Sequence, residues 1–200
     1  MRAFIAIELP APVLRQLITA QRRLARHLQT QQLDRCVRWM PAGNLHLTLR
    51  FLGEIDDVQQ RGLTQSLAQI VARHAPLTLF VDGMGCFPNA RRPSVIWCGL
   101  QGDLAALSRL QAEVESAAQS AGLLAETKPF TPHLTIGRLQ RSATGAQLQA
   151  IGAAAMHFAA MPGRLKEITP TVDELLLMRS ELTPSGSIYT RLGVFALQAA

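Results

Sequence analysis

The feature that constrains this chain most is a five-residue pattern that occurs twice. The sequence contains Leu45-His46-Leu47-Thr48-Leu49 in its first half and Pro132-His133-Leu134-Thr135-Ile136 in its second. Alternate side chains of a β-strand point to opposite faces, so each copy can bury its apolar residues and present one His and one Thr on the other face. The repeat therefore predicts two strands, one in each half, that carry the same polar pair.

The polar pair suits chemistry on an anion. Imidazole both accepts and donates protons near neutral pH, and a threonine hydroxyl can donate a hydrogen bond to an anionic oxygen. If the two strands face one cleft, His46, His133, Thr48 and Thr135 surround a single bound group. A phosphate group fits that description.

Two other interpretations of the histidines stay open. A lone His on a strand is commonly a hydrogen-bonded structural residue, although the duplication argues against this for the pair. Zinc is the second alternative, but known zinc signatures place two ligands close together on one element. Here each strand supplies one His with no carboxylate between, so we expect a site without a metal or another cofactor.

The basic charge of the chain bears on its partner. Hydrophobic residues make up 48% of the chain, enough for a real core, and 20 basic residues face 14 acidic ones. All the basic residues except Lys128 and Lys166 are Arg, which binds phosphate in a bidentate manner. The excess favours RNA or a nucleotide as partner, although a solvated basic surface explains it equally well.

The cysteines and the N-terminus bear on the compartment. Cys36, Cys86 and Cys98 have no Cys-x-x-Cys spacing, so we expect neither disulfides nor a zinc knuckle, as in a reducing cytoplasm. Glu8 and Pro10 interrupt the apolar N-terminus before a signal peptide could form. No apolar stretch has the length of a membrane span. We therefore expect a cytoplasmic protein without a membrane partner, and a monomer.

Periodicity predicts strands and helices along the whole chain. We expect strands over 3–9, 44–52, 77–81, 95–100, 133–138, 174–181 and 187–197, a short strand or turn at 37–41, and a turn at 183–186. We expect helices over 10–28, 57–74, 103–122 and 144–157, and a loop over 85–93. Asp57 with Gln60, and Thr144 with Gln147, predict capping boxes, and Asp103 a helix cap. The pattern predicts one bilobal α+β domain, residues 1–200, in which each lobe supplies one His strand.

Several segments resemble one known family. Residues 2–7, 37–39, 44–53, 87–93, 130–138, 177–180 and 184–189 are similar to the bacterial RNA 2',3'-cyclic phosphodiesterases, also called the 2'-5' RNA ligase family, of the two-histidine phosphoesterase superfamily. The resemblance spans almost the whole chain, and neither His-x-Thr motif departs from the family pattern. It implies two antiparallel sheets with helices outside and pseudo-twofold symmetry about a central cleft. It also implies metal-independent hydrolysis of RNA 2',3'-cyclic phosphate ends to 2'-phosphate ends, with reversible 2'-5' RNA ligation as a second activity.

The resemblance also implies roles for the polar pairs. His46 would donate a proton to the leaving 3'-oxygen, His133 would deprotonate water, and Thr48 and Thr135 would bind phosphate oxygens. In-line attack at phosphorus requires an acid and a base on opposite sides, and two lobes with one His each can supply them. The residues alone leave open which His is the acid, because the reaction is reversible and the two roles exchange in the reverse direction.

Two further residues follow from the resemblance. Arg138 would add positive charge at the phosphate, and Phe51 would stack on the terminal base. Each lies five residues after a His, so in a regular strand it would point to the wrong face, and a bulge or a strand end is needed to turn it inward. For Phe51 a core position is an equal alternative, because aromatic residues of strands are usually buried.

Two other functions stay open. A noncatalytic RNA-binding module would use the Arg excess and bind single strands in a salt-dependent manner, indifferent to both histidines. A phosphodiesterase of the same superfamily could instead open a cyclic phosphate on a small nucleotide or an ADP-ribose derivative. Comparing turnover of a mononucleotide and an oligonucleotide separates the last possibility from an RNA enzyme.

Overall fold

A computed structural model describes residues 1–159, 171–184 and 186–198. Its strands are β1 (Arg2–Glu8), β2 (Val37–Trp39), β3 (His46–Glu54), β4 (Leu77–Phe87), β5 (Val95–Gly102), β6 (Leu134–Leu139), β7 (Thr171–Val172), β8 (Glu174–Thr183) and β9 (Gly186–Ala196). Its helices are α1 (Ala11–Thr30), α2 (Asp57–Val71), α3 (Leu104–Ser120) and α4 (Gly145–Ala159), with 3-10 turns at Asp34–Cys36 and Ala42–Asn44. Ser185, in the turn expected at 183–186, lies outside the described residues.

The strands form two antiparallel halves that meet at one point. The order is β7-β4-β5-β6-β3-β1-β8-β9, with β2 beside β6. The halves join between β3 and β6, where Leu47 opposite Leu134 is the one residue pair recorded within the described chain. Further along β6, from Gly137 to Leu139, β2 takes the place of β3 as its partner. The two expected sheets are therefore linked through their His strands.

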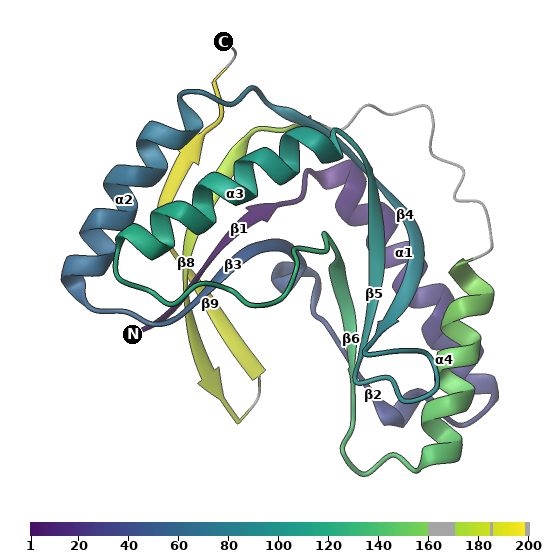
Figure 1. The fold of residues 1–200 in the computed structure, drawn as a ribbon. Coiled ribbons are helices and arrows are strands. Elements are labelled where there is room, and N and C mark those ends of the chain that lie inside the picture. The colour runs from purple at the N-terminus through teal and green to yellow at the C-terminus, as the bar shows by residue number, and fades with distance from the viewer. Residues whose placement is uncertain (160–170, 185, 199–200) are drawn as a thin grey trace.

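The helices cover the outside of both halves. In Figure 1, α2 and α3 lie together beside β8 and β3, and α1 and α4 lie together beside β4. Helix α1 follows β1 but packs on the half that contains β4, and α3 follows β5 but packs against β3. Each half of the sheet is thus covered in part by a helix that follows a strand of the other half, as an approximate twofold relation requires. The α+β class, the antiparallel pairing and the outer helices are confirmed.

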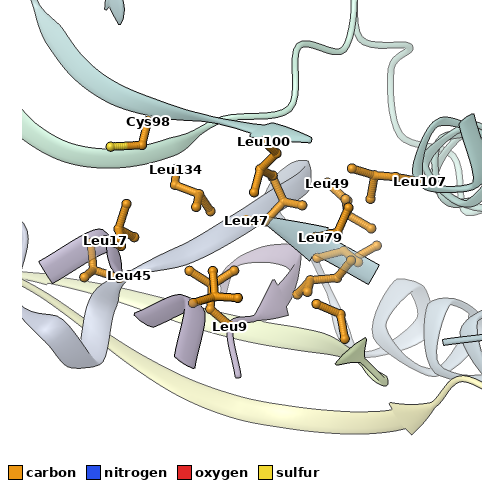
Figure 2. Packing of buried hydrophobic residues seen from close by; sticks show 14 of the residues in the cluster. Leu9, Leu17, Leu45, Leu47, Leu49, Leu79, Cys98, Leu100, Leu107 and Leu134 are labelled. Carbon is orange, nitrogen blue, oxygen red and sulfur yellow. The ribbon is translucent and has the colours of Figure 1, made fainter. Parts of the chain in front are cut away.

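One buried cluster connects the two halves and all four helices described. Leu47 and Leu134 belong to it and are fully buried, as Figure 2 shows for both. Burying a leucine side chain contributes roughly 1.5–3 kcal/mol, so turning either strand over would be costly. Because these leucines point to the core, the His and Thr residues beside them point to the opposite face of the sheet.

One capping prediction is wrong by one residue and one is confirmed. Helix α2 begins with a capping box of Asp56 and Gln59, where the Asp56 carboxylate accepts the Gln59 N–H at 2.8 Å. The sequence predicted Asp57, which is also followed three residues later by Gln. At α4, Thr144 N–H donates to Gln147 Oε1 at 2.8 Å and Gln147 N–H to Thr144 Oγ1 at 3.3 Å. That box is the predicted one.

Two other local features differ from expectation. Asp103 precedes α3 as predicted, but its carboxylate accepts the Thr78 N–H instead of an amide of its own helix. Strand β4 continues to Phe87, where a loop was expected from Gly85 onward. The Trp97 ring lies against Gly85, and a Cβ there would come 2.2 Å from Trp97 Cζ2. This glycine makes room for an aromatic ring and does not mark a turn.

No helix in the described part of the chain is long and apolar enough to cross a membrane.

Candidate functional site

The two His-x-Thr segments lie beside each other where the halves of the sheet meet. Strands β3 and β6 are antiparallel and pair at the central leucine of each segment. One residue to either side, the antiparallel direction brings His46 toward Thr135 and Thr48 toward His133. All four side chains lie on the face opposite the core. The structure therefore brings the four predicted residues to one surface.

The two imidazoles are held in the same way. His46 Nδ1 lies 2.8 Å from the Asn44 carbonyl oxygen, and His133 Nδ1 lies 2.7 Å from that of Thr131. A carbonyl oxygen only accepts hydrogen bonds, so Nδ1 carries a proton in both rings and Nε2 is the atom that gains or loses one. His46 Nε2 lies 3.0 Å from Thr48 Oγ1. Each ring is thus oriented by its own strand, with Nε2 available for proton transfer.

Two aromatic rings pack against each imidazole, always from its own half of the sheet. Around His46 these are Phe4 at 4.9 Å and Tyr189 at 5.3 Å, and around His133 they are Phe87 at 4.9 Å and Trp97 at 6.3 Å between ring centroids. The two histidines are therefore fixed to different halves although their strands are neighbours.

Each His strand contains an extra residue three positions after its His. The register of β3 with β1 skips Leu49, and the register of β6 with β5 skips Ile136. A β-bulge of this kind shifts the alternation of side chains. Residues five positions after each His, Phe51 and Arg138, consequently return to the His face. The bulges occupy equivalent positions, as the approximate twofold relation predicts.

The bulges leave Phe51 and Arg138 at the surface. Phe51 is 54% exposed, so it is not a core residue, and its ring lies 6.1 Å from that of Phe4. Arg138 is exposed and close enough for its charge to act on His46. Both line a cavity of about 460 Å³. Phe4 lines the same cavity and packs against the His46 ring, so the cavity lies beside His46.

Burial lowers the pKa of His46 below its ordinary value of 6.5. The hydrogen bond to the Asn44 carbonyl raises this pKa, and so does the negative charge of Glu8. The positive charge of Arg138 lowers it further, as does His133. The free protein therefore holds His46 mainly neutral at pH 7. The influence of His133 on this pKa reflects the proximity of the two rings.

We expect the substitution Arg138→Gln to raise the pKa of His46, because it removes a positive charge that disfavours the imidazolium. NMR titration of the ring resonances of the free protein measures the change. His46 should titrate below 6.5 before the substitution and at higher pH after it. The exposed Arg61→Gln on α2 serves as the control and should leave the midpoint in place. A midpoint insensitive to Arg138→Gln would contradict the proximity of the two groups.

Two residues at the site had no role assigned from the sequence. The Asn44 carbonyl orients His46, and its side-chain Nδ2 donates to the Ser187 carbonyl on β9 at 2.9 Å. Tyr189 packs on both His46 and Phe4. The position of Asn44 two residues before a His, matched by Thr131, is a signal that the sequence did contain. Tyr189 lies far along the chain, and no local pattern points to it.

The arrangement offers two proton-transfer groups and two hydroxyls on one face of the sheet, with a guanidinium further along β6. Such a set suits an anion whose reaction needs one proton removed and another supplied. In the described ranges, no group of three or more His, Cys, Asp or Glu side chains is placed to hold a metal ion.

Comparisons with known proteins match the chain over most of its length. A profile of the 2'-5' RNA ligase superfamily matches residues 15–183. The RNA 2',3'-cyclic phosphodiesterase of Methanothermobacter thermautotrophicus is 29% identical over 200 residues, which cover 98% of this chain and 99% of that protein. The RNA 2',3'-cyclic phosphodiesterase of Escherichia coli is 33% identical over 137 residues, covering 68% and 71%. Among solved structures, Escherichia coli LigT in its apo form is similar with a TM-score of 0.73 and 28% identity, covering 99% of this chain and 98% of LigT.

Proposed function

The chain belongs to the 2'-5' RNA ligase superfamily, and from that premise we propose that it hydrolyses RNA 2',3'-cyclic phosphate ends to 2'-phosphate ends with His46 and His133 as acid and base. The observation that carries the proposal is the pairing of β3 with β6, which brings the two His-x-Thr segments to one face. Curated relatives named RNA 2',3'-cyclic phosphodiesterase support the substrate.

In the proposed reaction, His133 Nε2 accepts a proton from water while the water oxygen attacks phosphorus. The bond from phosphorus to the 3'-oxygen breaks, and His46 Nε2 donates a proton to that oxygen, which leaves the phosphate on the 2'-oxygen. Attack and departure occur at opposite poles of phosphorus, so two imidazoles from different halves of the sheet suit the geometry. The anionic phosphate favours the protonated form of His46 and counteracts the effect of burial on its pKa. When the reaction runs in reverse, the two histidines exchange roles.

The other site residues stabilise the phosphate and the terminal base. Thr48 and Thr135 donate hydrogen bonds to the non-bridging oxygens, Arg138 adds positive charge, and Phe51 stacks on the base. Because these groups supply both proton transfer and charge stabilisation, the reaction uses no metal ion. Residues 1–200 act as one bilobal catalytic domain, each lobe supplying one His, and the protein works as a monomer on RNA ends in the cytoplasm.

The proposal is tested with an oligoribonucleotide that ends in a 2',3'-cyclic phosphate, incubated in excess EDTA. We expect conversion to a 2'-phosphate end at a rate that EDTA does not change. Unchanged substrate would overturn the activity. Loss of turnover in EDTA that added metal restores would overturn the metal-independent mechanism, and a 3'-phosphate product would overturn the assignment of the leaving oxygen.

We expect Thr48→Val and Thr135→Val each to lower kcat/KM by about 10- to 100-fold, because valine keeps the shape but loses a hydrogen bond to a charged oxygen. Initial rates on the same oligonucleotide measure the effect. Thr64→Val is the matched control, since the Thr64 hydroxyl on α2 donates only to the Gln60 carbonyl of its own helix. Rates equal to the wild type in both variants would remove the hydroxyls from the mechanism.

A further inference from the structure

The cavity beside His46 extends away from the two motifs, because none of His46, Thr48, His133 and Thr135 is among the residues that line it. It has a volume of about 460 Å³ and opens where β3 separates from β6 and β2 takes its place. Its basic lining comes from Arg2 on β1, Arg38 on β2 and Arg138 on β6. Its apolar lining includes Phe51 on β3 and Leu182 on the β8–β9 hairpin. The cavity therefore combines side chains that suit a phosphate with side chains that suit a base.

Arg38 and Arg138 form an unusual cross-strand pair. They are direct partners in the β2–β6 ladder, so their side chains lie on one face with Cβ atoms about 5 Å apart. Like charges in such positions destabilise a sheet. No carboxylate in the described chain pairs with either residue, whereas Arg179 and Arg191 on β8 and β9 pair with Glu181 and Glu8. A bound anion between the two guanidinium groups would remove the repulsion.

This anion position differs from the one at the histidines. On β6, Thr135 lies next to His133 at the junction with β3, whereas Arg138 lies beyond the bulge, where β2 is the neighbour. Arg38 is one strand further out than Arg138. Arg138 therefore lies between the imidazoles and Arg38, and Arg38 can receive the phosphate next in line from the one between the imidazoles.

The rim of the same cavity carries exposed apolar side chains. Leu182 is 67% exposed near the tip of the β8–β9 hairpin, where it lies opposite Ser187 and on the same face as Tyr189. Phe51 on β3, in the same half of the sheet, adds an exposed ring. Nucleobases stack on such surfaces with little dependence on sequence.

We infer that this cavity binds the RNA chain immediately 5' of the terminal nucleoside. The phosphodiester attached to the terminal 5'-oxygen lies at Arg38, with Arg2 on β1 at the same cavity, and the penultimate base covers Leu182. The inference rests on the proposed function and specifies its substrate class, an oligonucleotide end in preference to a mononucleotide. A nucleoside 2',3'-cyclic phosphate lacks both the phosphate and the second base.

Three substrates separate these contributions: a nucleoside 2',3'-cyclic phosphate, the same compound with a 5'-phosphate, and a dinucleotide with the cyclic end. We expect kcat/KM to rise by about tenfold or more when the 5'-phosphate is added, and again when the second nucleoside is added. Arg38→Gln should abolish most of the first gain, and Leu182→Ser most of the second. Arg61→Gln, an exposed arginine on α2, is the control and should keep both gains.

The outcomes distinguish the subsite from the activity itself. Equal kcat/KM on all three substrates would overturn the subsite and leave the proposed function standing. A fall by the same factor on all three substrates in Arg38→Gln would also overturn it, because Arg38 would then act at the cyclic phosphate or on folding. Absence of turnover on every substrate would overturn the proposed function and the subsite with it.

Discussion

Replacing His46 with alanine is expected to lower kcat/KM on cyclic phosphate ends by about 10²- to 10⁴-fold, and replacing His133 to do the same, because each substitution removes a positioned proton-transfer group. The two imidazoles act in a single step, so the double variant should lose little more than either single one. Each single variant should also lose one limb of the bell-shaped pH dependence of kcat/KM. Initial rates on an oligonucleotide with a cyclic phosphate end measure all three effects.

His157→Ala is the matched control for these variants. His157 is exposed in the last turn of α4 and packs only against Phe158 among ring contacts of the described residues. It should keep the wild-type rate. Turnover near the wild-type level in His46→Ala or His133→Ala would contradict the acid and base roles. RNA binding without turnover in the wild type, unaffected by either substitution, would favour the noncatalytic binding module.

The substitution Arg50→Ala is expected to lower the free energy of unfolding by about 3 kcal/mol. Arg50 is 8% exposed, and its Nε lies 2.5 Å from Glu115 Oε2 in an ion pair. It also donates hydrogen bonds to the carbonyls of Phe51, at 2.7 Å, and Leu124. Alanine would leave Glu115, which is 17% exposed, without its cation and would free both carbonyls.

Urea unfolding measures this loss. The control is Arg73→Ala, because Arg73 is 60% exposed in its pair with Glu113, and exposed pairs contribute about 0–1 kcal/mol. Stability of Arg50→Ala within that control range would contradict the structural role of the buried pair. Since Leu124 lies in the connection from α3 to β6, the same contacts tie the chain before His133 to β3.

The sequence was sufficient to predict the His strands because the signal is local. Leucines on one side of His46 and Thr48 must be buried, so the face that presents the polar pair is decided by alternation alone. The pairing of β3 with β6 is different, because it depends on strands that are distant along the chain. The duplication of the motif indicated that the two strands belong together, and the fold supplied their register.

The positions of Phe51 and Arg138 show where local pattern is not enough. Each reaches the His face through a bulge that exists only relative to the partner strand, β1 or β5. No residue type marks Leu49 or Ile136 as the extra one. Gly85 is the opposite case: as a turn signal it predicted a loop, but it lies in β4 because the Trp97 ring occupies the space of a side chain.

The cap of α2 was misplaced for a related reason. Asp56 and Asp57 are each followed by Gln three residues later, so both satisfy the capping pattern. The choice of Asp56 is consistent with the packing around it, where Ile55 is buried and the Gln59 side chain also donates to the Ala121 carbonyl after α3. Contacts between distant elements decide between two equally good local signals.

The most direct measurement is a titration of the protein with inorganic phosphate, followed through the ring resonances of His46 and His133 and assigned with the two alanine variants. If both imidazoles contact one phosphate, both sets of resonances should shift with a single Kd. Shifts at only one imidazole, or two different Kd values, would place the rings in separate pockets and contradict their action on one phosphorus atom.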